Sequence, residues 1–192
     1  YNTAYGSNSL KQNIDANYNT AIGDYAMELN TSGTANTVVG RAALASNTTA
    51  SNNTAIGYYA LKANTTGANN VAVGKSALTA NTTASNNIAL GEASLQANTT
   101  GAGNVSIGGG GTMYYNTTGA NNTAIGLASL KDNTTASNNT AVGGYALTNN
   151  TTGYSNLALG FYAMTTSTTS QSSVAVGHTA LDALTTGSNN IA

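Results

Sequence analysis

The sequence lacks cysteine, proline and tryptophan, and it has few charged residues. Without cysteine the chain has no disulfide and no thiolate chemistry. Charged residues make up 6% of the 192 residues, against about 25% in an ordinary domain, and the net charge is -1. The chain therefore has no excess of lysine and arginine of the kind that binds nucleic acid or an anionic membrane surface. No apolar run approaches the roughly 20 residues of a membrane-spanning helix.

Groups that carry catalysis are equally scarce. His178 is the one histidine, and the six acidic residues are scattered over different parts of the chain. A Ser-His-Asp or Cys-His triad needs more than these residues offer. The run Gly108–Gly111 is not followed by the Gly-Lys-Ser/Thr of a phosphate loop, so we interpret it as a bulge. We expect a protein that is not an enzyme and that binds no cofactor or metal.

One unit repeats along the whole chain. Residues 54–70 read TAIGYYALKANTTGANN, and residues 71–87 read VAVGKSALTANTTASNN. A fixed period predicts a repeat architecture, here a single domain over residues 1–192. Because the chain ends inside a twelfth unit, we expect it to be a fragment of a longer repetitive chain. Ten units have 17 residues and the one that begins at Val105 has 18; the starts are Thr3, Thr20, Thr37, Thr54, Val71, Ile88, Val105, Thr123, Thr140, Leu157 and Val174.

The columns of the unit predict short strands separated by tight turns. Positions 1 to 3 are β-branched, apolar or small, as strands prefer. Asparagine at positions 11, 16 and 17 marks two further corners, because it tolerates left-handed backbone. A unit of 17 residues is too short for two helices, and no Asn-Gly or Asp-Gly hairpin signal occurs. We therefore predict an all-β, parallel β-solenoid (β-roll) of about eleven turns. Position 4 is glycine throughout and should end each strand in a turn, as at Gly57, Gly74, Gly91 and Gly126.

Two apolar columns predict the core. Charges occur only at positions 5, 9, 10 and 13, which should therefore face water. Position 8 is leucine or methionine in every unit, and position 3 is always apolar. We expect both columns to form ladders inside the coil. The position-8 ladder includes Leu44, Leu61, Leu78, Leu95, Leu130 and Leu147, and the position-3 ladder includes Ile56, Val73, Leu90 and Ile125.

Strand positions 1 to 3 have no polar face, which predicts burial on both sides of the strand. The interior of the coil can bury one side, so the other side needs a partner surface. We predict lateral association of identical chains that buries the alanine, valine and isoleucine of these positions. A threefold bundle, another bundle number and an end-to-end filament are all compatible with the pattern.

The repeat also resembles known proteins. Its Ala-[Ile/Val]-Gly core followed by a small residue resembles the head repeats of YadA-type trimeric autotransporter adhesins. The longer form, Asn-Thr-Ala-Ile-Gly-Tyr-Tyr-Ala-Leu-Lys-Ala-Asn-Thr-Thr-Gly at residues 53–67, is similar to repeat regions of phage tail-fibre and bacterial surface proteins. The resemblance implies a left-handed β-roll with three chains side by side. It further implies an extracellular location, on a cell surface or a virion appendage, and the role of a fibre, stalk or adhesin shaft.

A binding surface on the same scaffold is the alternative. Threonine pairs such as Thr65-Thr66 and Thr82-Thr83 recur in successive units, and stacked threonines can match an ice lattice. A corner stabilised by stacking explains the same pairs more simply. Tyrosines at positions 5 and 6, as at Tyr58 and Tyr59, offer an edge that can bind glycans on a host surface.

Overall fold

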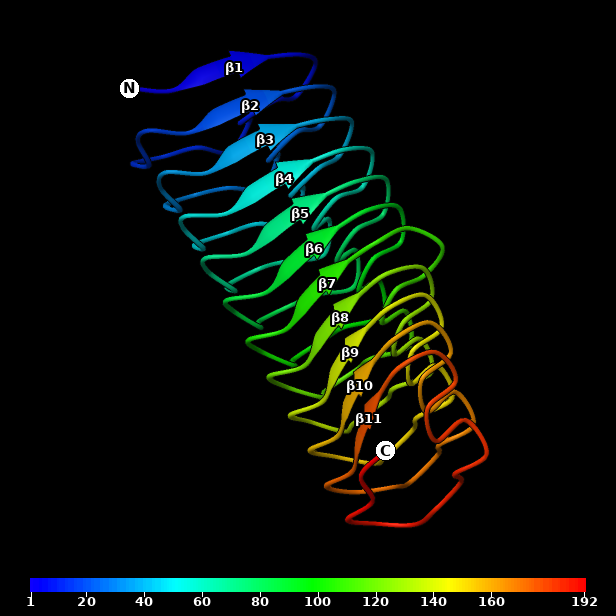
Figure 1. The fold of residues 1–192 in the computed structure, drawn as a ribbon. Coiled ribbons are helices and arrows are strands. Elements are labelled where there is room, and N and C mark those ends of the chain that lie inside the picture. The colour runs from blue at the N-terminus through cyan, green and yellow to red at the C-terminus, as the bar shows by residue number, and fades with distance from the viewer.

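The computed structural model describes residues 1–192 and contains eleven short strands and no helix. All strands are parallel and stack in chain order into one sheet, one strand per repeat unit (Figure 1). The predicted parallel β-solenoid is therefore confirmed. No segment forms a helix that could cross a membrane. The strands are β1 (Thr3–Tyr5), β2 (Thr20–Ile22), β3 (Thr37–Val39), β4 (Thr54–Ile56), β5 (Val71–Val73), β6 (Ile88–Leu90), β7 (Val105–Ile107), β8 (Thr123–Ile125), β9 (Thr140–Val142), β10 (Leu157–Leu159) and β11 (Val174–Val176).

The register of the sheet follows the repeat. Ala55 of β4 lies opposite Ala72 of β5, and Ile56 lies opposite Val73, so each position stacks on the same position of the next turn. The register also holds across the long unit, where Val105 of β7 pairs with Thr123 of β8. With strands about 4.8 Å apart, eleven turns extend roughly 50 Å along the stack.

Hydrogen bonds join successive turns on every side of the coil, not only at the strands. Of 122 backbone hydrogen bonds, 20 lie within the strands and 102 lie elsewhere. The Leu61 amide donates to the Ala77 carbonyl at 2.9 Å, and the Thr65 amide donates to the Thr82 carbonyl at 2.8 Å. Buried backbone groups need such partners. These bonds explain how three-residue strands can form a continuous stack.

Left-handed backbone turns the chain at several corners. Gly57 has a φ of +131°, and a Cβ on it would lie 2.6 Å from the Gly74 carbonyl oxygen, which confirms the predicted glycine turn. Positions 6, 8 and 16 also have positive φ, as at Tyr59 (59°), Leu61 (53°) and Asn69 (59°). Asparagine at position 16 is thus a corner, as expected. A leucine seldom adopts this conformation, and Leu61 adopts it with a fully buried side chain.

The position-8 ladder forms the centre of the core, as predicted. From Met27 to Met164 these side chains are completely buried and pack with the alanines of positions 2 and 7 in one cluster that runs along the solenoid. Small residues at positions 2 and 7 leave room for the larger position-8 side chain inside a narrow coil. The predicted leucines in this ladder are Leu44, Leu61, Leu78, Leu95, Leu130 and Leu147.

The prediction that position 3 lines the core is wrong. Ile56 is 38% exposed and Ile125 is 37% exposed, while Val73 and Leu90 are half-buried. Side chains alternate along a strand, so positions 1 and 3 share one face and position 2 has the other. The buried face is the one that carries alanine at position 2, as at Ala55. Positions 1 and 3 therefore point outwards.

Two columns of asparagine side chains also lie in the interior. Asn64 at position 11 is fully buried, and its Nδ2 donates to the Asn47 Oδ1 at 3.3 Å and to the Gly67 carbonyl at 2.9 Å. At position 17, the backbone amide of Asn70 donates to the side-chain Oδ1 of Asn53 at 2.9 Å. The backbone turns beside these positions, as expected: the Asn64 backbone amide donates to the Leu61 carbonyl at 3.2 Å. The sequence did not indicate that the asparagine side chains turn inwards and bond from turn to turn.

Candidate functional site

The outer sheet face is a regular surface that runs along all eleven strands. We define it as the side chains at positions 1 and 3 of the strands, such as Thr54, Ile56, Val71 and Val73. These residues are exposed or half-buried in every strand, and none of them is charged. Position 3 is apolar in every strand, whereas position 1 is threonine in six of the eleven strands. A large, mostly apolar and uncharged surface of this kind is typical of interaction sites.

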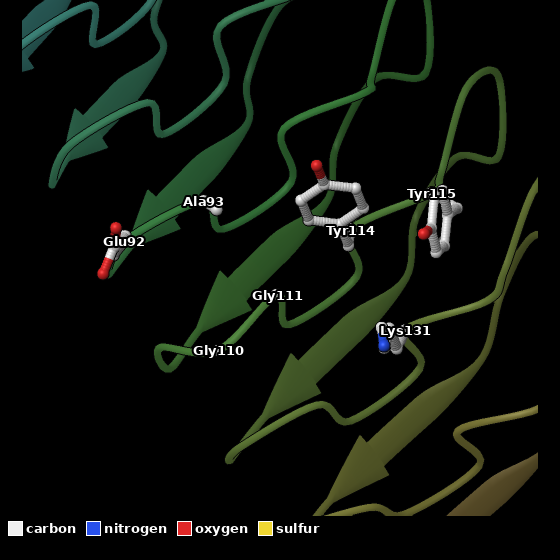
Figure 2. A pocket seen from close by; sticks show the side chains of 7 residues that line it. All are labelled: Glu92, Ala93, Gly110, Gly111, Tyr114, Tyr115 and Lys131. Atoms are coloured by element: carbon white, nitrogen blue, oxygen red, sulfur yellow. The ribbon is translucent and has the colours of Figure 1, made fainter.

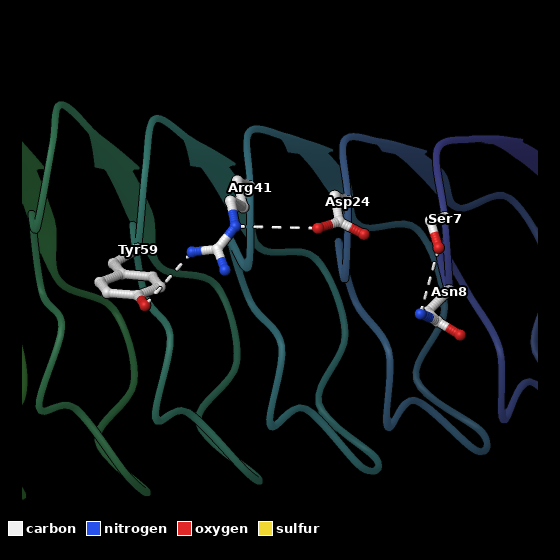
Figure 3. Close-up of polar contacts among 5 residues, drawn as sticks. All are labelled: Ser7, Asn8, Asp24, Arg41 and Tyr59. Carbon is white, nitrogen blue, oxygen red and sulfur yellow. Dashed lines mark hydrogen bonds and ion pairs between the residues drawn. The ribbon is translucent and has the colours of Figure 1, made fainter.

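Charged and aromatic side chains line a second surface, the aromatic edge, which we define as positions 5 and 6 of the turns. The Asp24 carboxylate lies 3.7 Å from the Arg41 Nε, and the Arg41 Nη1 donates to the Tyr59 hydroxyl at 3.4 Å. Figure 3 shows that these side chains, with Ser7 and Asn8, project from the same edge of successive turns. Charges at this edge are exposed or half-exposed, as predicted.

Within this edge, two tyrosines and two cations form one contact group. The Tyr58 and Tyr59 ring centroids are 3.9 Å apart, and the Lys62 ammonium lies 4.2 Å from the Tyr59 ring centroid. Hydrogen bonding to the Tyr58 hydroxyl, followed by that from the Arg41 guanidinium, lowers the pKa of Tyr59. The same interaction with Tyr59 raises the pKa of Tyr58. The pKa values of these two neighbouring tyrosines are therefore shifted in opposite directions.

A second aromatic group lies towards the C-terminal end of the same edge. Tyr145 and Tyr162 stack with centroids 5.0 Å apart, and Phe161 stacks on His178 at 5.9 Å. His178 is exposed in the position-5 column, as expected from its place in the repeat. No three His, Cys, Asp or Glu side chains come together in a group that would hold a metal ion.

The threonine columns do not form the paired array that an ice-binding surface would need. At position 12, the Thr65 hydroxyl is half-buried and donates to the Thr82 carbonyl of the next turn at 3.1 Å. At position 13, Thr66 is exposed. A turn with this threonine pair therefore presents the position-13 hydroxyl to water, while the position-12 hydroxyl bonds to the next turn.

The outer sheet face is the site that sequence reasoning placed wrongly, since half of it was assigned to the core. β-branched residues recur at position 1 as well as at position 3, which groups the two positions but does not indicate which face of the strand is buried. No protein-family model, curated protein or solved structure matches the chain. Its function must therefore be argued from the geometry.

Proposed function

We propose that the chain is a segment of an extracellular fibre, stalk or adhesin shaft, on a cell surface or a virion appendage. Its role is structural and not catalytic: it spaces or presents other parts of the appendage. Identical chains associate laterally, and a threefold bundle is the arrangement that the resemblance to trimeric adhesin repeats favours. The stacking of one turn on the next suits such a role, because the length of the rod grows in proportion to the number of units.

The outer sheet face is the single observation that carries the proposal. It is uncharged, apolar at position 3 and threonine or aliphatic at position 1 in every strand, so two or more solenoids can bury it against each other over their whole length. The position-2 alanines already fill the inner side of each strand. Lateral association therefore covers positions 1 and 3 and leaves the aromatic edge and position 13 in water.

Paired substitutions on matched surfaces test this arrangement. Ile56→Glu with Val73→Glu places two charges on the outer sheet face, and Thr66→Glu with Thr83→Glu places two on exposed position 13 of the same two turns. In sedimentation analysis, the unmodified chain should have a multiple of its 19.1 kDa mass. The first variant should dissociate towards a monomer, and the second should not.

The measured mass also separates the alternatives. Threefold the chain mass supports the trimer, another fixed multiple supports a different bundle, and polydisperse growth supports an end-to-end filament. Negative-stain images of the unmodified protein should show thin rods of uniform width. A stable monomer, or dissociation of the position-13 variant alone, contradicts lateral association through the outer sheet face.

A further inference from the structure

The long turn is the one place where the repeat is interrupted on the surface. Its unit has 18 residues, and the run Gly108–Gly111 occupies its first corner. In the regular turns, the amide at position 6 donates to the position-5 carbonyl of the preceding turn, as the Ala93 amide does to the Lys75 carbonyl at 2.9 Å. At the long turn this bond is missing, so the Glu92 carbonyl has no backbone donor. The glycine loop therefore lies outside the hydrogen-bonded stack of turns.

The displaced loop opens a pocket of about 310 Å³. Glu92 and Ala93 line it from the preceding turn, and Lys131 lines it from the following turn (Figure 2). The remaining lining residues belong to the long turn and are Gly110, Gly111, Tyr114 and Tyr115. The rest of the surface has no comparable pocket.

Two hydrogen bonds fix the base of this loop. The Thr112 hydroxyl donates to the Gly126 carbonyl of the next turn at 2.8 Å, and the Ser106 hydroxyl donates to the Thr112 carbonyl at 3.1 Å. Gly110 and Gly111 have φ values of +65° and +79°, a region that favours glycine. The pocket is thus formed before any ligand binds, which lowers the entropic cost of binding.

The lining residues combine aromatic rings with one free cation and one carboxylate. The Tyr114 and Tyr115 rings meet edge to face with centroids 4.7 Å apart, which forms an aromatic corner. Lys131 forms no ion pair, and the Glu92 carboxylate pairs with Lys75 outside the pocket, at 3.1 Å. The opposite charges of Glu92 and Lys131 disfavour a phosphate ligand and suit a ligand rich in hydroxyl groups.

We propose that this pocket binds a single pyranose unit of a glycan. The C–H face of the sugar packs against the tyrosine corner, and the Glu92 carboxylate and Lys131 ammonium bond to its hydroxyl groups. The volume lies at the lower end of the range for ligand sites, which suits one sugar ring and not an oligosaccharide. The site adds a ligand to the proposed fibre and does not depend on how the chains associate.

The test uses the whole chain and methyl glycosides of a hexose, an N-acetylhexosamine and a hexuronic acid as probes. Saturation-transfer NMR should detect at least one of them, with a Kd on the order of 1 mM. Tyr114→Ala should weaken that binding at least about tenfold, while Tyr154→Ala, at an exposed position of a regular turn outside the pocket, should leave it unchanged. Lys131→Ala should weaken the hexuronic acid more than the neutral sugars if the carboxylate is recognised.

Deletion of Gly110 is the sharpest variant, because it restores a 17-residue unit. Circular dichroism and the melting temperature should remain close to those of the unmodified chain, while glycoside binding should be lost. If the deletion variant does not fold, Tyr114→Ala decides the question alone. The proposal is overturned if no glycoside binds, if binding survives both changes, or if Tyr154→Ala abolishes it equally.

Discussion

Gly74 shows how strictly one residue can be required. Its φ is +135°, and a Cβ on it would lie 2.5 Å from the Gly91 carbonyl oxygen. Gly74→Ala should therefore destabilise the fold by at least about 1–3 kcal/mol from backbone strain, with the steric clash added. Gly109→Ala is the control, because nothing lies within 4 Å of its added Cβ. Urea unfolding should show a large loss of stability for the first variant and little change for the second; equal losses contradict this account.

Tyr58 and Tyr59 are predicted to titrate separately. The lowered pKa of Tyr59 means that its ionised form favours the folded state. This contribution is present above the pKa of the unfolded chain and is lost as the pH falls through the folded pKa. The raised pKa of Tyr58 has the opposite sign, so its contribution is lost as the pH rises through the folded pKa. In an NMR titration Tyr59 should ionise first, and Tyr58→Phe should raise the pKa of Tyr59. Ionisation in the reverse order refutes this.

Single positions differ in how far the sequence reveals them. Position 8 was predictable, because leucine or methionine in every unit has no explanation other than burial. Position 3 was not, because a strand of three residues is too short for its pattern to show which face is inside. Alanine at position 2 is the interior residue, and its small size reflects the narrow coil.

At the scale of the element, the position-11 ladder continues only while each turn supplies an asparagine. Ser167 replaces it in the tenth unit, and its hydroxyl bonds to the Ser170 hydroxyl at 2.6 Å. The buried Asn150 Oδ1 is left without a partner. Ser167→Asn should supply the missing donor and stabilise the fold by about 1 kcal/mol.

Urea unfolding measures this gain, with Thr169→Asn at exposed position 13 of the same unit as the control. The control should change little, since it reaches no buried acceptor. If Ser167→Asn gives no gain, the Asn150 oxygen is already satisfied by an ordered water. Buried asparagine ladders were not predictable, because asparagine is usually exposed. Only the stacking of identical amides in register makes their burial acceptable.

The whole molecule behaves as a stack of interchangeable turns. Position 14 alternates between glycine and alanine over several turns, as at Ala50, Gly67, Ala84 and Gly101. Deletion of residues 54–87 removes two whole turns. The turn that contains Ala50 is then followed by the turn that contains Gly101, so the alternation at position 14 is kept. The shortened chain should fold and melt at a moderately lower temperature, because stability in such stacks is roughly a sum over turns and their interfaces.

Deletion of residues 54–78 is the matched control, since it ends inside a turn and puts every later position out of register. This variant should lose the cooperative melting transition and the circular dichroism of the solenoid. If both deletions are tolerated equally, register is not what specifies the fold. The period and the parallel stack were predictable from the sequence at this scale, whereas the outer sheet face depended on knowing which side of each strand is buried.

The position-11 ladder has a direction. The Asn47 Nδ2 donates to the Asn30 Oδ1 at 2.8 Å, the Asn81 Nδ2 to the Asn64 Oδ1 at 2.9 Å, and the Asn98 Nδ2 to the Asn81 Oδ1 at 3.0 Å, always towards the preceding turn. The side-chain dipoles are therefore aligned along the rod. Its two ends are electrically unlike, so rods joined head to tail bring donors to acceptors, whereas rods joined head to head bring donors to donors. A fibre assembled head to tail from this unit would consequently be polar, with two distinguishable ends. Polarised infrared spectroscopy can detect the alignment of its asparagine amides.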